Sequence, residues 1–237
     1  MQLFYNPEIN NNTDQIVFNK EESRHIVRVL RKKELDSLNI TNGNGFLFEA
    51  KIIVASDKKC IAEIVSSIKQ QKAWDYYLHV AIAPTKNIDR LEWFLEKATE
   101  IGIDEITPLL CQNSERKIIK KERLEKIMLS AMKQSLKFQL PKLNELTSFS
   151  DFLNQQNSNE TICIAHCELS DKKKLSEVIK KHDKITILIG PEGDFSAHEI
   201  QKSTDQNIIP ITFGESRLRT ETAGLVAVQN ISFLHQL

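Results

Sequence analysis

The sequence contains no long hydrophobic run. No apolar stretch reaches the roughly 18 residues that a membrane-spanning helix needs, so we expect no membrane segment. The N-terminal residues MQLFYNPEIN have neither a basic start nor an apolar core, and we expect no signal peptide. With 41% hydrophobic and 27% charged residues, the composition is that of a soluble globular protein. A chain of 237 residues accommodates one large domain, or a small domain and a larger one.

Cysteine is also scarce. Cys60, Cys111, Cys163 and Cys167 form no CxxC pair. The spacing of Cys163 and Cys167 would suit the start of a metal site, but both lie in an apolar run with no second pair. We therefore expect no metal, and we predict four buried, free thiols in a reducing cytoplasm.

Net charge is absent as well. The 32 basic and 32 acidic residues cancel, which argues against a protein that coats nucleic acid non-specifically. Basic residues nevertheless cluster in segments 24–33 and 117–126. A solvated helix face or a local nucleic-acid footprint would explain either cluster. The sequence has no Walker or GxGxxG motif, which disfavours a phosphate- or nucleotide-binding α/β protein.

The first 70 residues have the pattern of short strands with one helix. Thr41-Asn-Gly-Asn-Gly45 is a strong hairpin signal. The expected elements are a helix over residues 21–30 and strands over residues 35–40, 46–54 and 60–68. Such a series of short strands suggests a small barrel.

A polar stretch then separates this part from a second pattern. Strands and helices alternate from Tyr76 onward, which indicates a parallel sheet with helical crossovers. Trp93 is expected in the core, beside Leu91, Phe94 and Leu95. The expected strands cover residues 78–83, 106–110 and 161–165, and the expected helices cover residues 88–101, 122–137 and 173–181. Gly102 is a C-cap signal for the first of these helices.

Two segments near the C-terminus fit neither ordinary helix nor ordinary strand patterning. Residues 185–196 and 211–225 each begin as a β-branched run, break at glycine and continue into a helical pattern. Glycine lets a backbone approach a ligand closely, and a strand followed by a glycine turn and a helix start places N–H groups around that ligand. Ser196 and Glu199 have the spacing of a capping box. Two ordinary βα turns would explain the pattern, but two close together, one rich in charge, favour a binding site.

Several segments together resemble the RsmE family of ribosomal RNA methyltransferases, whose members N3-methylate one uridine of 16S rRNA. The most specific are Ile189-Gly-Pro-Glu-Gly-Asp-Phe-Ser196 and Leu218-Arg-Thr-Glu-Thr-Ala223. Three residues depart from the family pattern. Asp194 stands where a third glycine is usual, Lys133 where glutamate is frequent, and Lys137 where arginine is common. Supporting segments are residues 25–31, 42–45, 86–102, 115–116 and 130–135.

The resemblance implies a fold and a cofactor. Residues 1–70 would form a PUA-like RNA-binding β-barrel, residues 71–75 a linker, and residues 76–237 an α/β SPOUT domain with a parallel sheet and a C-terminal trefoil knot. Such enzymes bind S-adenosylmethionine in a bent shape and are usually homodimers. The expected activity is N3-methylation of a specific uridine in the 16S rRNA of the small ribosomal subunit.

The glycine turns then give a candidate site. Arg219 is the candidate for stabilising developing uracil charge and Glu221 for accepting or orienting the proton; pairing of these two side chains at a helix start is the alternative. Glu192 would act as a base or hold its loop through backbone N–H groups, and we favour the second role. The cofactor-binding candidates are Ile189, Gly190, Gly193, Phe213, Gly214, Leu218 and Thr220, with His166 and Cys167 as a third wall.

The RNA contacts are predicted on basic side chains, because Lys and Arg bind phosphates. The candidates are Arg24, Arg28, Arg31, Lys86, Arg90 and Arg116. Other functions remain open at this point. A SPOUT enzyme that methylates another base or a ribose 2′-oxygen would need the same glycine turns, and a non-catalytic assembly factor could keep the fold for packing alone.

Overall fold

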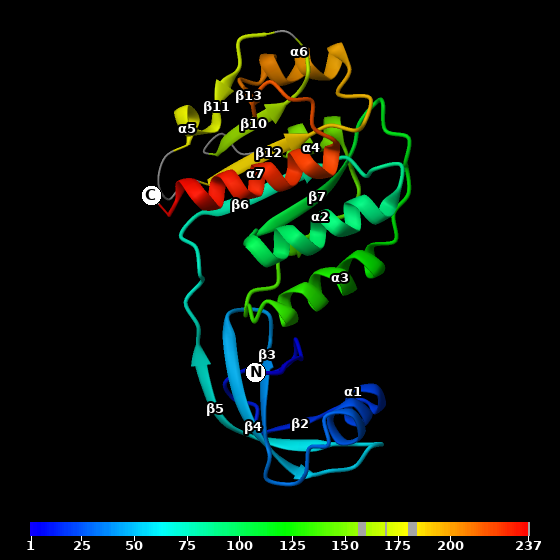
Figure 1. Cartoon of the computed structure of the whole chain (residues 1–237), viewed down its shortest axis with the longest axis vertical. Helices are drawn as coiled ribbons and strands as arrows, with labels where there is room; N and C mark the ends of the chain where they lie inside the picture. The colour runs from blue at the N-terminus through cyan, green and yellow to red at the C-terminus, as the bar shows by residue number, and fades with distance from the viewer. Residues whose placement is uncertain (156–159, 169, 180–183, 237) are drawn as a thin grey trace. The chain divides into compact units, whose positions relative to one another are not determined.

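The computed structural model (Figure 1) describes residues 1–155, 160–168, 170–179 and 184–236. It divides into two compact units. The first contains residues 1–72 and 132–140, and the second contains residues 73–131 and 141–237. Residues 132–140 therefore belong with the N-terminal strands, although they are distant from them in sequence.

The first unit is built on a five-stranded sheet of order β1-β3-β4-β5-β2. The hairpin predicted at residues 41–45 joins β3 to β4, which pair antiparallel. Alternate side chains of β4 are buried, with Phe48, Ala50 and Ile52 in the core, as expected for a half-buried strand. The elements are β1 (Leu3–Tyr5), β2 (Gln15–Val17), α1 (Lys20–Arg24), the π-helix η1 (His25–Val29), β3 (Ser37–Thr41), β4 (Phe46–Val54) and β5 (Ile61–Lys69).

The second unit contains a parallel sheet of order β11-β13-β10-β12-β6-β7-β8, with β9 also paired to β7. Every strand pair in it is parallel, as the strand–helix alternation predicts. The strands are β6 (Tyr77–Ile82), β7 (Glu105–Leu110), β8 (Lys142–Leu143), β9 (Thr147–Ser148), β10 (Thr161–Ala165), β11 (Lys173–Lys174), β12 (Lys184–Ile189) and β13 (Ile209–Thr212).

Two helices of this unit pack together along the sheet (Figure 1). They are α2 (Ile88–Ile101) and α7 (Thr220–Leu234). A Cβ on Gly224 would lie 2.8 Å from both Ile82 and Phe94, so this glycine lets α7 approach β6 and α2. The remaining helices are α3 (Lys121–Gln134), α4 (Phe149–Asn154), α5 (Leu175–Val178) and α6 (Ala197–Asp205). None of the described helices is long and apolar enough to cross a membrane.

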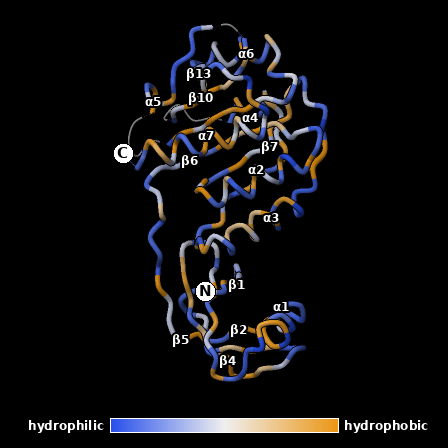
Figure 2. The backbone as a smooth tube through the Cα atoms, viewed as in Figure 1, coloured by the Kyte–Doolittle hydropathy of each residue, from blue (hydrophilic) through white to orange (hydrophobic). Residues whose placement is uncertain are grey.

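The prediction that Trp93 lies in the core is wrong. Hydrophobic and hydrophilic residues alternate along α2 (Figure 2), and Leu91, Phe94 and Leu95 form its buried face. At 3.6 residues per turn Trp93 points about 200° away from Leu91. Its side chain is accordingly 43% exposed.

Three expected elements have different bounds. The helix expected over residues 173–181 is replaced by β11 and by α5, which ends at Val178; Ile179 is extended, and residues 180 and 181 lie outside the described residues. The helix expected to reach residue 137 ends at Gln134, and Leu136 has a positive φ of 54°. The strand expected from Leu35 begins at Ser37, because Leu35 has a φ of 72°.

Candidate active site

Three neighbouring strands of the second sheet end together. In the register, Ala165 at the end of β10 lies opposite Ile189 of β12 on one side and Ile211 of β13 on the other. Because the strands are parallel, the loops that follow them leave from one edge of the sheet. Ligands bind at such carboxyl edges in open α/β sheets.

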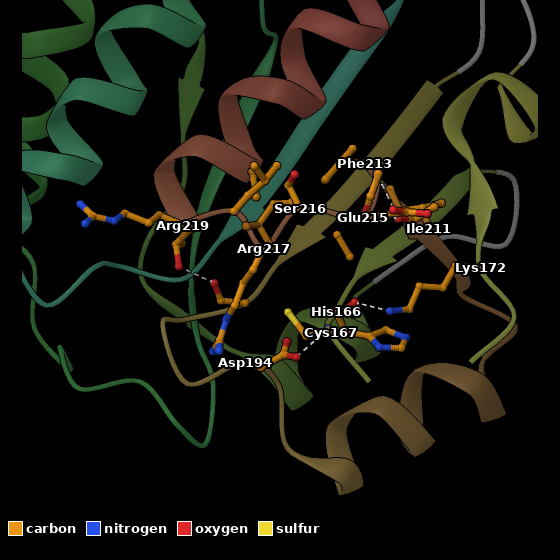
Figure 3. Close-up of a pocket in the computed structure, with 18 of the residues that line it drawn as sticks. His166, Cys167, Lys172, Asp194, Ile211, Phe213, Glu215, Ser216, Arg217 and Arg219 are labelled. Carbon is orange, nitrogen blue, oxygen red and sulfur yellow. Dashed lines mark hydrogen bonds between the residues drawn. The ribbon is translucent and has the colours of Figure 1, made fainter. Parts of the chain in front are cut away.

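A pocket of about 860 Å³ lies between these loops (Figure 3). Almost all the cofactor-binding candidates line it: His166, Cys167, Ile189, Gly190, Phe213, Gly214, Leu218 and Thr220. Gly193 does not. A Cβ on Gly193 would meet Asn113 at 3.3 Å, so this glycine serves packing behind the loop.

The first glycine turn follows β12 and is held from several sides. A Cβ on Gly190 would lie 3.0 Å from the ring of Phe195, which is buried in the core. Thr220 Oγ1 donates a hydrogen bond of 3.0 Å to the Gly190 carbonyl, and this bond joins the turn to the start of α7. Glu192 Oε1 accepts the backbone N–H of Lys86 at 2.9 Å, which agrees with the loop-holding role that we favoured.

Asp194 follows Gly193 in the first glycine turn. Its φ is +63°, in the left-handed region that glycine enters freely and that aspartate tolerates. Asp194 Oδ2 accepts the backbone N–H of Cys167 at 2.7 Å, and Oδ1 accepts that of Phe195 at 2.8 Å. Asp194 therefore connects this turn to the end of β10.

The turn then runs into α6 through a capping box, as predicted. Ser196 Oγ accepts the backbone N–H of Glu199 at 3.3 Å, and Glu199 Oε2 accepts that of Ser196 at 2.9 Å. Glu199 is only 6% exposed, and its other oxygen accepts the backbone N–H of Gln112 at 2.9 Å. The cap therefore also ties α6 to the segment after β7.

The second glycine turn follows β13 and is more open. Gly214 has a φ of +116°, and a Cβ there would meet no heavy atom within 4 Å. Glycine is thus needed for its conformation. Thr212 Oγ1 both accepts the N–H of Gly214 at 3.1 Å and donates to its carbonyl at 3.0 Å, so the turn is closed on itself beside the pocket.

The wall formed by the β10 loop carries unusual electrostatics. Burial, together with the nearby charge of Lys172, lowers the pKa of His166, so the imidazole is neutral at pH 7. Its Nδ1 atom is buried and has no hydrogen-bond partner among the described residues. An unpaired buried polar atom costs free energy.

Cys167 differs from its prediction. Cys60, Cys111 and Cys163 are free and buried, but Cys167 is free and exposed, because it lies beyond the last residue of β10 in the pocket mouth. Desolvation, and then the negative charge of Asp194, raise the pKa of its thiol. The described residues contain no group of three His, Cys, Asp or Glu side chains placed to hold a metal ion.

The two catalytic candidates occupy different places. Arg219 is exposed and lines the pocket. Glu221 is not among the lining residues; it is 8% exposed, and its Oε1 lies 3.8 Å from Arg90 Nε. Its Oε2 is buried without a partner among the described residues. The alternative of a direct Arg219–Glu221 ion pair is wrong, because the ion pair that Glu221 forms joins α7 to Arg90 of α2.

The RNA-contact candidates also separate into groups. Arg24, Arg28 and Arg31 are exposed in the first unit, where Arg28 pairs with Asp57 at 2.8 Å. In the second unit, Lys86 pairs with Glu115 at 2.8 Å.

Among the described residues, the Arg116 side chain donates its hydrogen bonds to backbone carbonyls. It donates to the carbonyls of Thr85 at 3.0 Å and Lys86 at 2.6 Å. Its guanidinium therefore holds the segment before α2 together.

Sequence reasoning missed four charged lining residues: Lys172, Asp194, Glu215 and Arg217. Asp194 and Arg217 lie inside the glycine-turn segments, so charge in a turn that helix propensity does not require was a usable signal. Lys172 had no such signal. Its Nζ reaches the His166 carbonyl at 2.6 Å through the path of the β10 loop, which the sequence pattern does not reveal.

Comparisons with known proteins agree with this geometry. A family model described as an RNA methyltransferase domain matches residues 72–232, and one described as an RNA methyltransferase PUA domain matches residues 18–65. A ribosomal RNA small subunit methyltransferase E from Buchnera aphidicola subsp. Acyrthosiphon pisum is 34% identical, over 91% of this chain and 87% of its own length.

Two solved structures are similar over almost the whole chain. The crystal structure of a probable rRNA-methyltransferase from Porphyromonas gingivalis has 40% sequence identity and a TM-score of 0.93, covering 100% of this chain and 99% of that one. A putative methyltransferase from Legionella pneumophila, in complex with the bound cofactor SAM, has 25% identity and a TM-score of 0.85, covering 98% and 96%.

The fold and the site thus define an RNA methyltransferase with an N-terminal PUA domain. Within that class, the chain belongs to the RsmE family, that of ribosomal RNA small subunit methyltransferase E. The resemblance carried by the glycine-turn segments is confirmed.

Proposed function

We propose that the protein transfers a methyl group from S-adenosylmethionine to N3 of a specific uridine in 16S rRNA. The observation that carries this proposal is the pocket at the joined ends of β10, β12 and β13, lined by both glycine turns, in a chain of the RsmE family. When bound, S-adenosylmethionine supplies an electrophilic methyl group. The residues that would hold it are the lining candidates, including Gly190, Gly214 and His166.

The reaction forms an N3–CH₃ bond, breaks the S–CH₃ bond and releases the N3 proton. Positioning of two reactants can lower a barrier by roughly 7–11 kcal/mol. Arg219 at the pocket mouth is the proposed cation that stabilises charge on the uracil carbonyls. For Glu221 we propose the orienting role and not that of proton acceptor. Its carboxylate faces Arg90 and does not line the pocket.

Further RNA contacts are proposed on basic side chains of each unit. Arg24 and Arg31 are exposed in the first unit. In the second unit, Lys86 is exposed and Arg90 is half-buried beside Glu221. Phosphate contacts make affinity fall as salt rises. A binding constant unchanged between low and moderate salt would contradict this set.

We also propose a homodimer, a trefoil knot and a cytoplasmic location. Free cysteines suit a reducing compartment. The dimer proposal uses the outer face of α7, where Leu225 and Val226 are half-buried and Phe233 is 53% exposed. Phe233→Glu should shift the mass measured by light scattering toward the monomer, whereas Gln206→Glu at the exposed end of α6 should not.

The deciding experiment uses small ribosomal subunits that lack the modification, incubated with protein and labelled S-adenosylmethionine. The RNA is digested and the labelled nucleoside identified. Recovery of 3-methyluridine is expected. Recovery of another methylated base or of a 2′-O-methyl nucleoside would show a different acceptor within the same enzyme class. If no label is incorporated and no cofactor is bound, the protein is a non-catalytic RNA-binding protein.

A further inference from the structure

Two opposite charges at the mouth of the pocket have no part in the roles assigned so far. Arg217 is exposed and lines the pocket, and within the described part of the chain it makes no hydrogen bond or ion pair. Its side chain runs from the second glycine turn toward Asp194 of the first (Figure 3). Both residues line the pocket, as does Cys167.

The Asp194 carboxylate is fixed before any ligand arrives. Its two oxygens accept the N–H groups of Cys167 and Phe195 at 2.7 and 2.8 Å. Each carboxylate oxygen has a second lone pair, so both can accept another donor. Asn113 Nδ2 also donates to the Gly193 and Asp194 carbonyls at 3.1 Å, which restrains the backbone on either side.

The other cations of the pocket are less suited to bind an anion there. Lys172 Nζ donates to the His166 carbonyl at 2.6 Å. Arg219 leaves the same turn in a different direction, away from Asp194 (Figure 3). Arg217 is therefore the guanidinium that shares this end of the pocket with a fixed carboxylate.

We propose that Arg217 and Asp194 bind the amino-acid end of S-adenosylmethionine, with Arg217 on its carboxylate and Asp194 on its ammonium group. This rests on the proposed function, in which backbone groups and apolar side chains such as Ile189 and Phe213 hold the adenosine end. A pair of opposite charges complements a zwitterion, and guanidinium binds carboxylate in a planar, two-bond geometry. Asp194 thus adds a ligand contact that glycine at this position would lack.

The test measures calorimetric affinity for three ligands that share the adenosine end. S-adenosylmethionine carries both charged groups, and decarboxylated S-adenosylmethionine keeps the ammonium alone. 5′-Methylthioadenosine lacks both groups together with the sulfonium charge, so each variant is compared with the wild type on the same ligand. Arg217→Gln should weaken S-adenosylmethionine about tenfold, in line with a charge-assisted hydrogen bond, and leave the other two unchanged. Asp194→Asn tolerates the left-handed backbone but keeps only one acceptor oxygen, so it also loses one of the two backbone hydrogen bonds. It should weaken both ammonium-bearing ligands more than it weakens 5′-methylthioadenosine.

Arg123→Gln is the matched control, since Arg123 lies on α3 outside the pocket and pairs with Glu92; it should bind all three ligands as the wild type does. Equal weakening of all three ligands by Arg217→Gln, or of none, overturns the proposal. Unchanged ligand affinity with weaker RNA binding would assign the guanidinium to RNA instead. A wild-type protein that binds none of the three would refute the proposed function itself.

Discussion

Replacement of Thr220 by valine tests the connection between the two glycine turns. Thr220 is 5% exposed, and its hydroxyl donates to the Gly190 carbonyl at 3.0 Å. Valine keeps the branched shape and removes the donor. The lost bond is worth about 0.5–1.5 kcal/mol, and an unpaired buried carbonyl costs about 1–3 kcal/mol. We expect the free energy of unfolding to fall by about 2 kcal/mol.

The same change should weaken cofactor binding, because Gly190 is a lining residue whose turn would lose its link to α7. Urea unfolding and calorimetry with S-adenosylhomocysteine measure the two effects. Thr220→Ser is the control: it keeps the hydroxyl and loses one methyl group, which costs about 1 kcal/mol of burial, and it should bind the ligand normally. If valine binds and unfolds like serine, the hydroxyl does not organise the site.

Three further predictions concern particular side chains. Burial lowers the pKa of His79 from 6.5 to about 4. As pH falls, the unfolded protein therefore binds a proton at this side chain before the folded protein does, and the free energy of unfolding should decrease between pH 6.5 and 4. In His79→Gln the urea midpoint should depend less on pH over this range, and a pH dependence equal to that of the wild type would contradict the prediction. Trp93→Ala should cost far less unfolding free energy than Phe94→Ala, for which about 3–5 kcal/mol is expected; equal losses would argue against the observed exposure. Iodoacetamide should label Cys167 before the three buried thiols, as measured by peptide mass spectrometry. S-adenosylhomocysteine should slow the labelling of Cys167. An equal labelling rate with and without this ligand would show that the bound ligand does not cover the thiol.

The sequence predicted those parts of the site whose structure depends on local chemistry. Glycine turns, the Ser196 cap and the β-branched runs each act within a few residues, and all three were found in the structure. That Asp194 and Arg217 share one pocket became visible only when the fold joined two segments that are more than twenty residues apart. Glu221 was misplaced for a similar reason, since its partner Arg90 lies on another helix.

Trp93 shows a different limit. Its neighbours Leu91, Phe94 and Leu95 are apolar, and an apolar neighbourhood suggests burial, but helical geometry places the tryptophan on the opposite side. The short α5 shows a third limit, because the pattern of residues 173–181 suits a helix while pairing of Lys173 and Lys174 with β13 takes the first two residues into a strand.

The position of β10 between β12 and β13 has a consequence for biosynthesis. Each wall of the pocket comes from a different stretch, near residues 166, 190 and 214, and the turn at Gly190 is secured by Thr220. A chain emerging from the ribosome begins to fold from its N-terminal end, so the strands can assemble before the pocket exists. We therefore expect a nascent or prematurely terminated chain that lacks α7 to bind the methyl donor more weakly, because its Gly190 turn lacks the hydrogen bond from Thr220.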